Sequence, residues 1–221
     1  MTVFHPYPED LPSEFAVFPL TGALLLPKGK LPLNIFEPRY LAMVLDSLAA
    51  GRMFGMVQPD PQAPKLEHGP GLYRVGCLGR LSSFSETDDG KLLITLTGLI
   101  RFTIDSELDL CRGYRRVRGD FSRYHDDLDV TAATLDLERD KLLAALKGYF
   151  AHRGVDANWD AIRRMSDDAL VVTLGMACPF EPVEKQALLE APTAAERAAT
   201  LLALLQMGAA GPDLPPGHSV S

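Results

Sequence analysis

The densest group of side chains that could bind a ligand is a run of arginines. Arg112, Tyr114, Arg116 and Arg118 alternate along the chain, so on a β-strand they share one face. Guanidinium groups around an aromatic ring can clamp a phosphate backbone and stack on a base, which makes RNA binding through these residues one hypothesis. The window 105–129 also contains seven Asp or Glu residues. A salt-bridged, solvated sheet face is therefore the alternative.

The motifs of catalysis and of cofactor binding are missing from the sequence. Neither Gly29-Lys30 nor Gly90-Lys91 is followed by the hydroxyl residue that a phosphate-binding loop needs. No G-x-S-x-G, H-E-x-x-H or C-x-x-C occurs. The acidic segment 125–129, with His125, could be imagined as a hard-metal site, but its charge is typical of a solvated linker. We therefore expect no catalytic residue, no cofactor and no metal.

Charge and cysteine usage limit the partners. The 221 residues carry 22 Lys or Arg and 29 Asp or Glu, a net charge of −7, which disfavours DNA and anionic membranes. No apolar run approaches the roughly 20 residues of a membrane span, and the first residues do not resemble a signal peptide. Cys77, Cys111 and Cys178 are odd in number and far apart, which argues against a disulfide framework and predicts a cytoplasmic location.

A long alternating segment gives the clearest structural prediction. From Leu92 to Ile104 the apolar residues occupy even positions, so one face should pack on a core while the other, with Arg101, faces water. The turn 88–90 predicts a hairpin with 71–84, and Gly98 predicts a bulge. Further strands are expected at 15–19, 31–36, 53–57 and 113–121. Six short strands favour a small closed or half-closed barrel.

Helices are expected within and after this β-rich region. Pro38 suits the first position of a helix that ends at Gly51, with an apolar stripe of Leu41, Val44, Leu45 and Leu48. The alanine-rich rear of the chain predicts helices at 131–150, 159–165, 167–177, 179–190 and 194–207. The expected organisation is a β-rich subdomain at 1–125, a helical subdomain at 126–208 and a flexible tail at 209–221.

Three stretches carry a family pattern. The first stretch contains Phe18-Pro19-Leu20 and the run from Pro27 to Tyr40, which ends in LPLNIFEPRY. The second stretch runs from Gly98 to Phe102, and the third runs from Pro179 to Glu190. Together they resemble the N-terminal substrate-recognition domain of the Lon protease, in the stand-alone form found in bacteria. The chain departs from the family's P-G pair because Lys28 stands between Pro27 and Gly29.

The resemblance implies an α+β fold: a PUA-like six-stranded pseudo-barrel with one helix, followed by a C-terminal α-helical bundle. It also implies a non-catalytic module that binds exposed apolar segments of unfolded or partner polypeptide, in connection with protein quality control. The ATPase and Ser–Lys protease modules of Lon are not expected in this chain. RNA binding stays the alternative, since PUA-like barrels often bind RNA, and a monomer or weak dimer is expected.

The residues expected to edge a peptide groove follow the first stretch of the pattern. They are Leu33, Ile35, Phe36, Arg39 and Tyr40. Pro32 removes a donor from the strand that carries them, which predicts an edge strand. The alternative is that Glu37, Arg39 and Tyr40 serve structure alone, with Glu37 at the positive end of the helix dipole.

Overall fold

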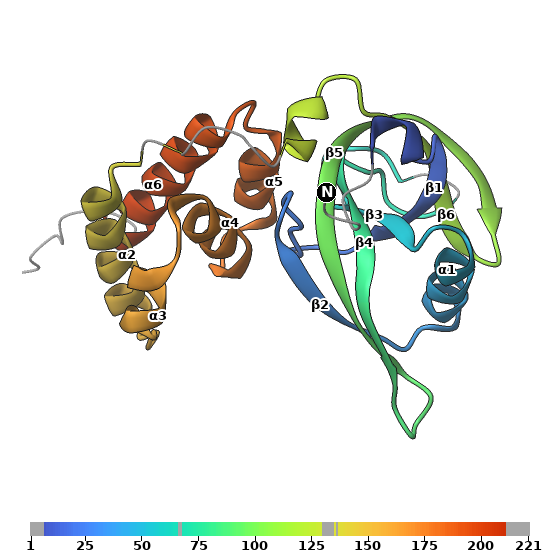
Figure 1. The fold of residues 1–221 in the computed structure, drawn as a ribbon, viewed down its shortest axis with the longest axis horizontal. Helices are drawn as coiled ribbons and strands as arrows, with labels where there is room; N and C mark the ends of the chain where they lie inside the picture. The colour runs from blue at the N-terminus through green and yellow to red at the C-terminus, as the bar shows by residue number, and fades with distance from the viewer. Residues whose placement is uncertain (1–6, 66–67, 130–134, 136, 211–221) are drawn as a thin grey trace, which may run out of the picture. The chain divides into compact units, whose positions relative to one another are not determined.

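The computed structural model describes residues 7–65, 68–129, 135 and 137–210, and its contacts divide the chain into two compact units (Figure 1). The barrel unit comprises 1–133 with 172–190, and the helical unit comprises 134–171 with 191–221. The subdomain boundary expected at residue 125 stays a prediction. The expected tail, 209–221, lies outside the described residues from 211 onward.

Six strands form one mixed sheet in the barrel unit. The sheet order is β2-β5-β4-β3-β1-β6, and β6 also pairs with β5. Five strands therefore close into a ring, with β2 attached outside it through β5. All pairs are antiparallel except β1 with β3. The expected six-stranded pseudo-barrel is confirmed, with β2 extending the five-stranded ring, and so is the edge position of the Pro32 strand. The strands are β1 (Glu14–Pro19), β2 (Lys30–Ile35), β3 (Met53–Val57), β4 (Val75–Glu86), β5 (Leu92–Cys111) and β6 (Tyr114–Asp120).

The long strand β5 organises the core of the barrel. Its even-numbered apolar residues from Leu92 to Ile104 are buried, and Ile100 and Phe102 are fully enclosed. The Phe102 ring meets the Phe15 ring edge to face at 4.8 Å between centroids. The predicted irregularity is confirmed, because the register with β4 shifts at Gly98. A Cβ at Gly98 would lie 2.1 Å from the Leu26 carbonyl oxygen, so glycine is required there by close backbone approach.

The charged residue Arg101 of β5 does not follow the expected alternation. Arg101 was expected to face water, but it is 4% exposed. The short 3-10 helix η2 (His125–Leu128) packs on this stretch of β5, and helix α5 (Pro182–Glu190) offers the Leu189 carbonyl to Arg101 at 3.3 Å. The covering elements come from distant sequence, so a period-two pattern cannot reveal them.

Helix α1 (Pro38–Ala49) begins at the expected proline and ends before Gly51, whose φ is +82°. Its buried face differs from the expected stripe. The buried positions are Tyr40, Ala42, Met43, Val44 and Ser47, whereas Leu45 is 51% exposed. The Tyr40 ring packs on the Phe18 ring, with 4.3 Å between the ring centroids. This contact rotates the helix relative to the expected orientation, so that Tyr40, Val44 and Ser47 face the barrel.

The remaining helices also lie close to their expected positions. Helix α2 starts at Arg139 and not at residue 131. Residues 130–134 and 136 are outside the described set. The Arg139 N–H donates to the Leu137 carbonyl, which forms a turn tighter than that of an α-helix just before α2. Helix α5 starts at Pro182 and not at Pro179, because a start at Pro179 would put Pro182 at the fourth helical position, where its missing N–H would leave a helix carbonyl without a donor. The helices are α2 (Arg139–Arg153), α3 (Trp159–Arg164), α4 (Asp167–Ala177), α5 (Pro182–Glu190) and α6 (Ala194–Ala210); a short 3-10 helix η1 (Pro8–Asp10) precedes β1.

In the helical unit, α2 packs against α6. The Arg139 guanidinium bonds Asp167 and the carbonyls of Ile162 and Met165, which ties the start of α2 to the α3–α4 corner. Helix α5 and residues 172–177 of α4 belong to the barrel unit. Within the described part of the chain, no helix is long and apolar enough to cross a membrane.

Candidate functional site

The expected peptide-binding residues lie where β2 meets α1. Ile35 and Tyr40 are buried in the barrel, at 1% and 7% exposure. Phe36 is 61% exposed, Arg39 is exposed and Leu33 is half-buried. The structure therefore divides the group: Leu33, Phe36 and Arg39 have solvent-accessible surface, whereas Ile35 and Tyr40 are packed into the barrel.

The contacts of Arg39 and Tyr40 fix the geometry of this junction. The Arg39 guanidinium donates to the Glu37 carboxylate at 2.8 Å and lies over the Tyr40 ring at 4.5 Å. Burial raises the pKa of the Tyr40 hydroxyl, while the nearby Arg39 charge opposes that rise. These contacts order the first turn of α1, with Arg39 and Tyr40, next to the exposed Phe36 ring.

A small pocket of about 160 Å³ adjoins the first turn of α1, and its lining includes residues of both the peptide-binding and the RNA-binding hypothesis. Arg39 and Tyr40 line it together with Tyr114 and Arg115. Arg115 was not singled out from the sequence, because it lies on the opposite face of its strand from the expected arginine row. Its guanidinium is buried, bonds the Glu107 carboxylate at 2.6 Å and donates to the Pro70 carbonyl at 2.7 Å.

The four residues of the RNA hypothesis are each engaged with acidic groups. Arg112 lies in the β5–β6 turn at φ +49°, outside the strand, and bonds Asp46 at 2.6 Å. Tyr114 is buried, and its hydroxyl donates to the same Asp46 at 2.9 Å. Arg116 and Arg118 both pair with Glu14 of β1. These arginines are ion-paired, but with Asp46 and Glu14, which lie outside the acidic window 105–129.

The segment imagined as a metal site is organised around an arginine instead. The Asp127 carboxylate accepts hydrogen bonds from the Arg101 backbone N–H, from Nε and from Nη2, at 3.0, 2.9 and 2.9 Å. Among the described residues no group of three or more His, Cys, Asp or Glu is arranged to hold a metal ion. The prediction of a solvated linker was wrong for Asp127, whose side chain is 8% exposed.

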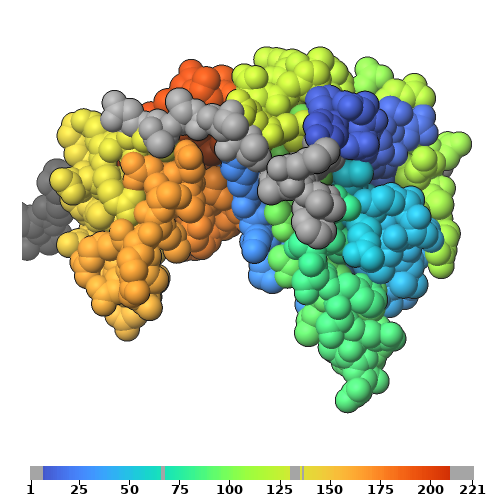
Figure 2. Space-filling model, in the orientation of Figure 1, coloured from blue at the N-terminus to red at the C-terminus, as the bar shows by residue number. Residues whose placement is uncertain are grey.

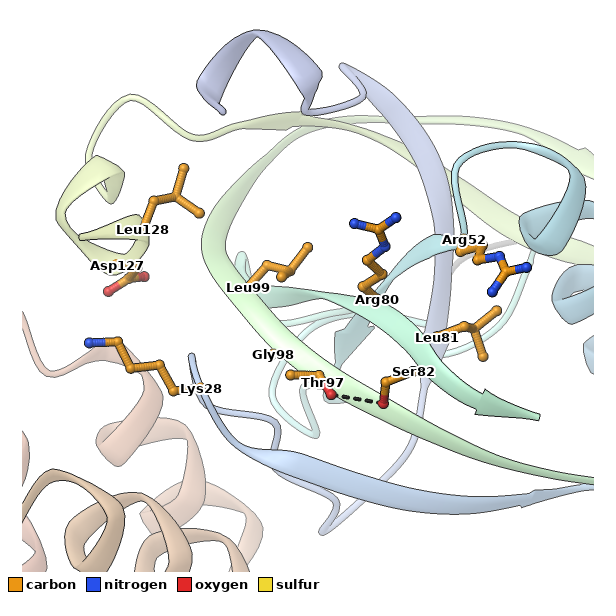
Figure 3. A pocket seen from close by; sticks show the side chains of 10 residues that line it. All are labelled: Lys28, Arg52, Arg80, Leu81, Ser82, Thr97, Gly98, Leu99, Asp127 and Leu128. Atoms are coloured by element: carbon orange, nitrogen blue, oxygen red, sulfur yellow. Dashed lines mark hydrogen bonds between the residues drawn. The ribbon is translucent and has the colours of Figure 1, made fainter. Parts of the chain in front are cut away.

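A larger cavity, of about 410 Å³, opens on the barrel unit (Figure 3). Its basic residues are Lys28, Arg52 and Arg80, from three separate segments. The Lys28 ammonium donates to the Asp129 carbonyl at 3.2 Å. No sequence motif joins these three residues, so only the fold brings them together.

The rest of this cavity is mostly apolar. Leu81 and Leu99 are buried, and Leu128 is half-buried. The hydroxyls of Ser82 and Thr97 bond each other at 2.9 Å across the β4–β5 pair. In Figure 3, Leu99 and Leu128 lie on one side of Arg80, whereas Arg52 and Leu81 lie on the other. Figure 2 shows the β4–β5 hairpin, in green, projecting from the rest of the barrel unit.

Solved structures with the same fold support the architecture. The chain matches a Lon N-terminal domain protein from Xanthomonas campestris with a TM-score of 0.59 and 22% identity, over 87% of this chain and 98% of that one. It matches the N-terminal domain of a Mycobacterium avium complex Lon protease with a TM-score of 0.59 and 16% identity, over 87% and 97% of the two chains.

Sequence relatives point the same way. A Lon protease from Anaeromyxobacter dehalogenans is 26% identical over 137 residues, which are 59% of this chain and 16% of that protein. A Lon protease from Desulfosudis oleivorans is 24% identical over 94 residues, or 42% and 12%. The chain thus spans less than a fifth of the length of these relatives.

The family itself is defined by a match over most of the chain. Residues 14–207 match the ATP-dependent protease La (LON) substrate-binding domain. This range includes all six strands and most of the last helix, and the resemblance first seen at Phe18–Tyr40 is confirmed. The chain belongs to the family of Lon substrate-binding domains.

Proposed function

We propose that the chain is a non-catalytic module that binds exposed apolar segments of polypeptide through the surface at the β2–α1 junction. Membership of a substrate-binding family supports protein recognition in general. The observation that carries the particular surface is the Phe36 ring, which is 61% exposed and lies in the sequence between the buried residues Ile35 and Tyr40. An aromatic ring held out by buried neighbours is a typical anchor for an apolar partner.

The expected affinity is weak. A flexible polypeptide loses conformational entropy when it binds, and one exposed ring with a half-buried Leu33 compensates for little more than that loss. We therefore expect a Kd in the micromolar range or looser. Since apolar burial is not screened by ions, the affinity should change little between low and high salt.

The test uses the full chain and a reduced, carboxymethylated protein that cannot refold. Phe36→Ala should weaken binding measured by fluorescence anisotropy, whereas Met207→Ala should not. Met207 is a matched control because it is a large apolar residue with 60% exposure on another unit of the chain. Equal affinities for the parent and the Phe36 variant would contradict the proposal.

RNA binding is the outcome that would replace this function. It predicts affinity for single-stranded RNA that falls steeply with salt, because each phosphate contact releases counterions. It also predicts loss of binding when Arg112, Arg116 and Arg118 are changed to Glu. The observed ion pairs of these arginines with Asp46 and Glu14 favour the polypeptide proposal.

A further inference from the structure

The large cavity of the barrel unit carries positive charge that the described residues leave unneutralised. None of the ion pairs among them involves Arg52 or Arg80. The acidic side chain in the lining, Asp127, is already paired with Arg101. Two guanidinium groups are therefore available to an anion at this cavity.

Backbone strain is concentrated at the same cavity. In the described part of the chain, three residues other than glycine have positive φ, and two of them, Lys28 at +67° and Arg52 at +64°, line the cavity. This conformation disfavours residues with a Cβ, and glycine would adopt it without strain. Strained residues of this kind gather at functional sites, so a basic side chain held there in place of glycine points to a ligand.

The walls of the cavity limit what that ligand can be. Leu81, Leu99 and Leu128 offer an apolar surface, and the two arginines offer planar groups that match a carboxylate with two parallel hydrogen bonds. A ligand that satisfies both parts carries one anionic group next to an apolar one. The volume of about 410 Å³ lies within the roughly 300–1,000 Å³ of small-ligand pockets.

We propose that this cavity binds the C-terminal carboxylate of a polypeptide whose last residue is apolar, with Arg80 and Arg52 holding the carboxylate and the leucines holding the side chain. The proposal rests on the proposed function in one respect, that the ligand is polypeptide. It adds a second determinant: the Phe36 surface binds internal apolar segments, and the cavity recognises a chain end. A nucleic acid lacks the apolar part, whereas small amphipathic acids such as fatty acids also carry a carboxylate next to an apolar group.

The test compares two peptides on the full chain. The probe is Gly-Ser-Gly-Ser-Leu-Leu, labelled at its N-terminus, with either a free C-terminal carboxylate or an amide in its place. The free acid should bind about tenfold or more tightly than the amide, because a charge-assisted hydrogen bond is lost with the carboxylate. Arg80→Gln should weaken binding of the acid and reduce its advantage over the amide, and Arg80→Gln combined with Arg52→Gln should bring the two peptides to equal affinity.

Two controls separate recognition from general charge and from misfolding. Arg123→Gln removes the same charge from an exposed residue that does not line the cavity, and it should keep the preference for the acid. Arg80→Lys keeps the charge but not the planar fork, and it should bind the acid with intermediate affinity. Each variant must show the thermal unfolding transition of the parent.

The outcomes distinguish the two proposals. If the unfolded protein binds through Phe36 while acid and amide bind equally, the cavity proposal is overturned and the proposed function stands. If the acid peptide binds through Arg80 while the unfolded protein ignores Phe36, the cavity proposal stands without the Phe36 surface. If decanoate binds through Arg80 and neither peptide does, the carboxylate site belongs to a small amphipathic acid and the polypeptide assignment is wrong.

Discussion

Arg101 and Asp127 form a buried ion pair that fastens η2 to the outer face of β5. Their side chains are 5% and 8% exposed, and Nε lies 2.9 Å from Oδ2. The Arg101 guanidinium also lies over the Tyr124 ring at 4.7 Å. A charge buried so far from water depends on its partner, since removing one member leaves the other desolvated and uncompensated.

Asp127→Ala should therefore lower the free energy of unfolding by about 3–5 kcal/mol, the usual cost of breaking a buried pair. Asp126→Ala is the matched control, because the neighbouring side chain is exposed, and it should change stability by less than about 0.5 kcal/mol. Urea unfolding measures both. The double variant Arg101→Met, Asp127→Leu should recover part of the loss, because no charge is then left without a partner.

The core predicted from the alternation of β5 can be tested with charges on its two faces. Phe102→Asp would bury an unpaired carboxylate among Phe15, Phe121 and their neighbours, at a cost of several kcal/mol, and should unfold the barrel unit. Leu93→Asp is the control, because Leu93 is 46% exposed, and the folded structure should survive it. Circular dichroism melts compare them, and equal melting temperatures would mean that the assignment of the core face is wrong.

Local sequence patterns predicted those parts of the fold that local patterns control. The period of β5 identified its buried face, Pro38 and Gly51 identified the ends of α1, and Gly98 identified the bulge. Each of these depends on a residue's own backbone preference or on its immediate neighbours.

The missed features depend on partners far along the chain. The burial of Arg101 requires Asp127 and the Leu189 carbonyl, and the rotation of α1 requires Phe18. The candidate sites also differ in whether neighbouring or distant residues form them. The Leu33–Tyr40 surface could be proposed from the sequence because its residues are contiguous, whereas Arg52 and Arg80 line one cavity only in the folded barrel.

Alkaline pH should destabilise the fold through its buried tyrosines. Burial, then hydrogen bonding by neighbouring groups, among them the Asp46 carboxylate, raise the pKa of Tyr114 above the ordinary value of 10.0, and burial raises that of Tyr40. The unfolded chain then loses these protons first as pH rises. The contribution of these two protonated tyrosines to the free energy of unfolding is therefore complete below pH 10.0 and is lost progressively as the pH rises above it.

Melting temperatures between about pH 8 and pH 11 measure this effect. Tyr114→Phe should lower stability at pH 8 by about 1–3 kcal/mol, because Asp46 loses a hydrogen-bond donor, but it should flatten the alkaline decline. Tyr7→Phe removes an exposed tyrosine and should leave the decline as steep as in the parent. An unchanged slope in the Tyr114 variant would show that this hydroxyl does not govern the decline.

The strain at Arg52 can be separated from the function of its side chain. Arg52 follows Gly51 after the end of α1, and its N–H donates to the Ser47 carbonyl at 2.7 Å while φ stays at +64°. Arg52→Gly removes the strain energy of a Cβ in that conformation. This gain exceeds the entropy cost of folding that glycine adds by making the unfolded chain more flexible. We expect a gain of up to about 1 kcal/mol, or roughly 2–4 °C in melting temperature for a chain of this size.

Arg52→Ala is the comparison that decides the cause. It also removes the guanidinium but keeps a Cβ at positive φ, so it should not raise the melting temperature. Both variants should bind the free-acid peptide more weakly than the parent, because both lack one of the two cavity arginines. The result expected is therefore one variant that is more stable and one that is not, with the same loss of binding. If glycine and alanine give equal stability, the backbone at residue 52 holds no strain, and only the arginines and the apolar walls of the cavity then favour a ligand there.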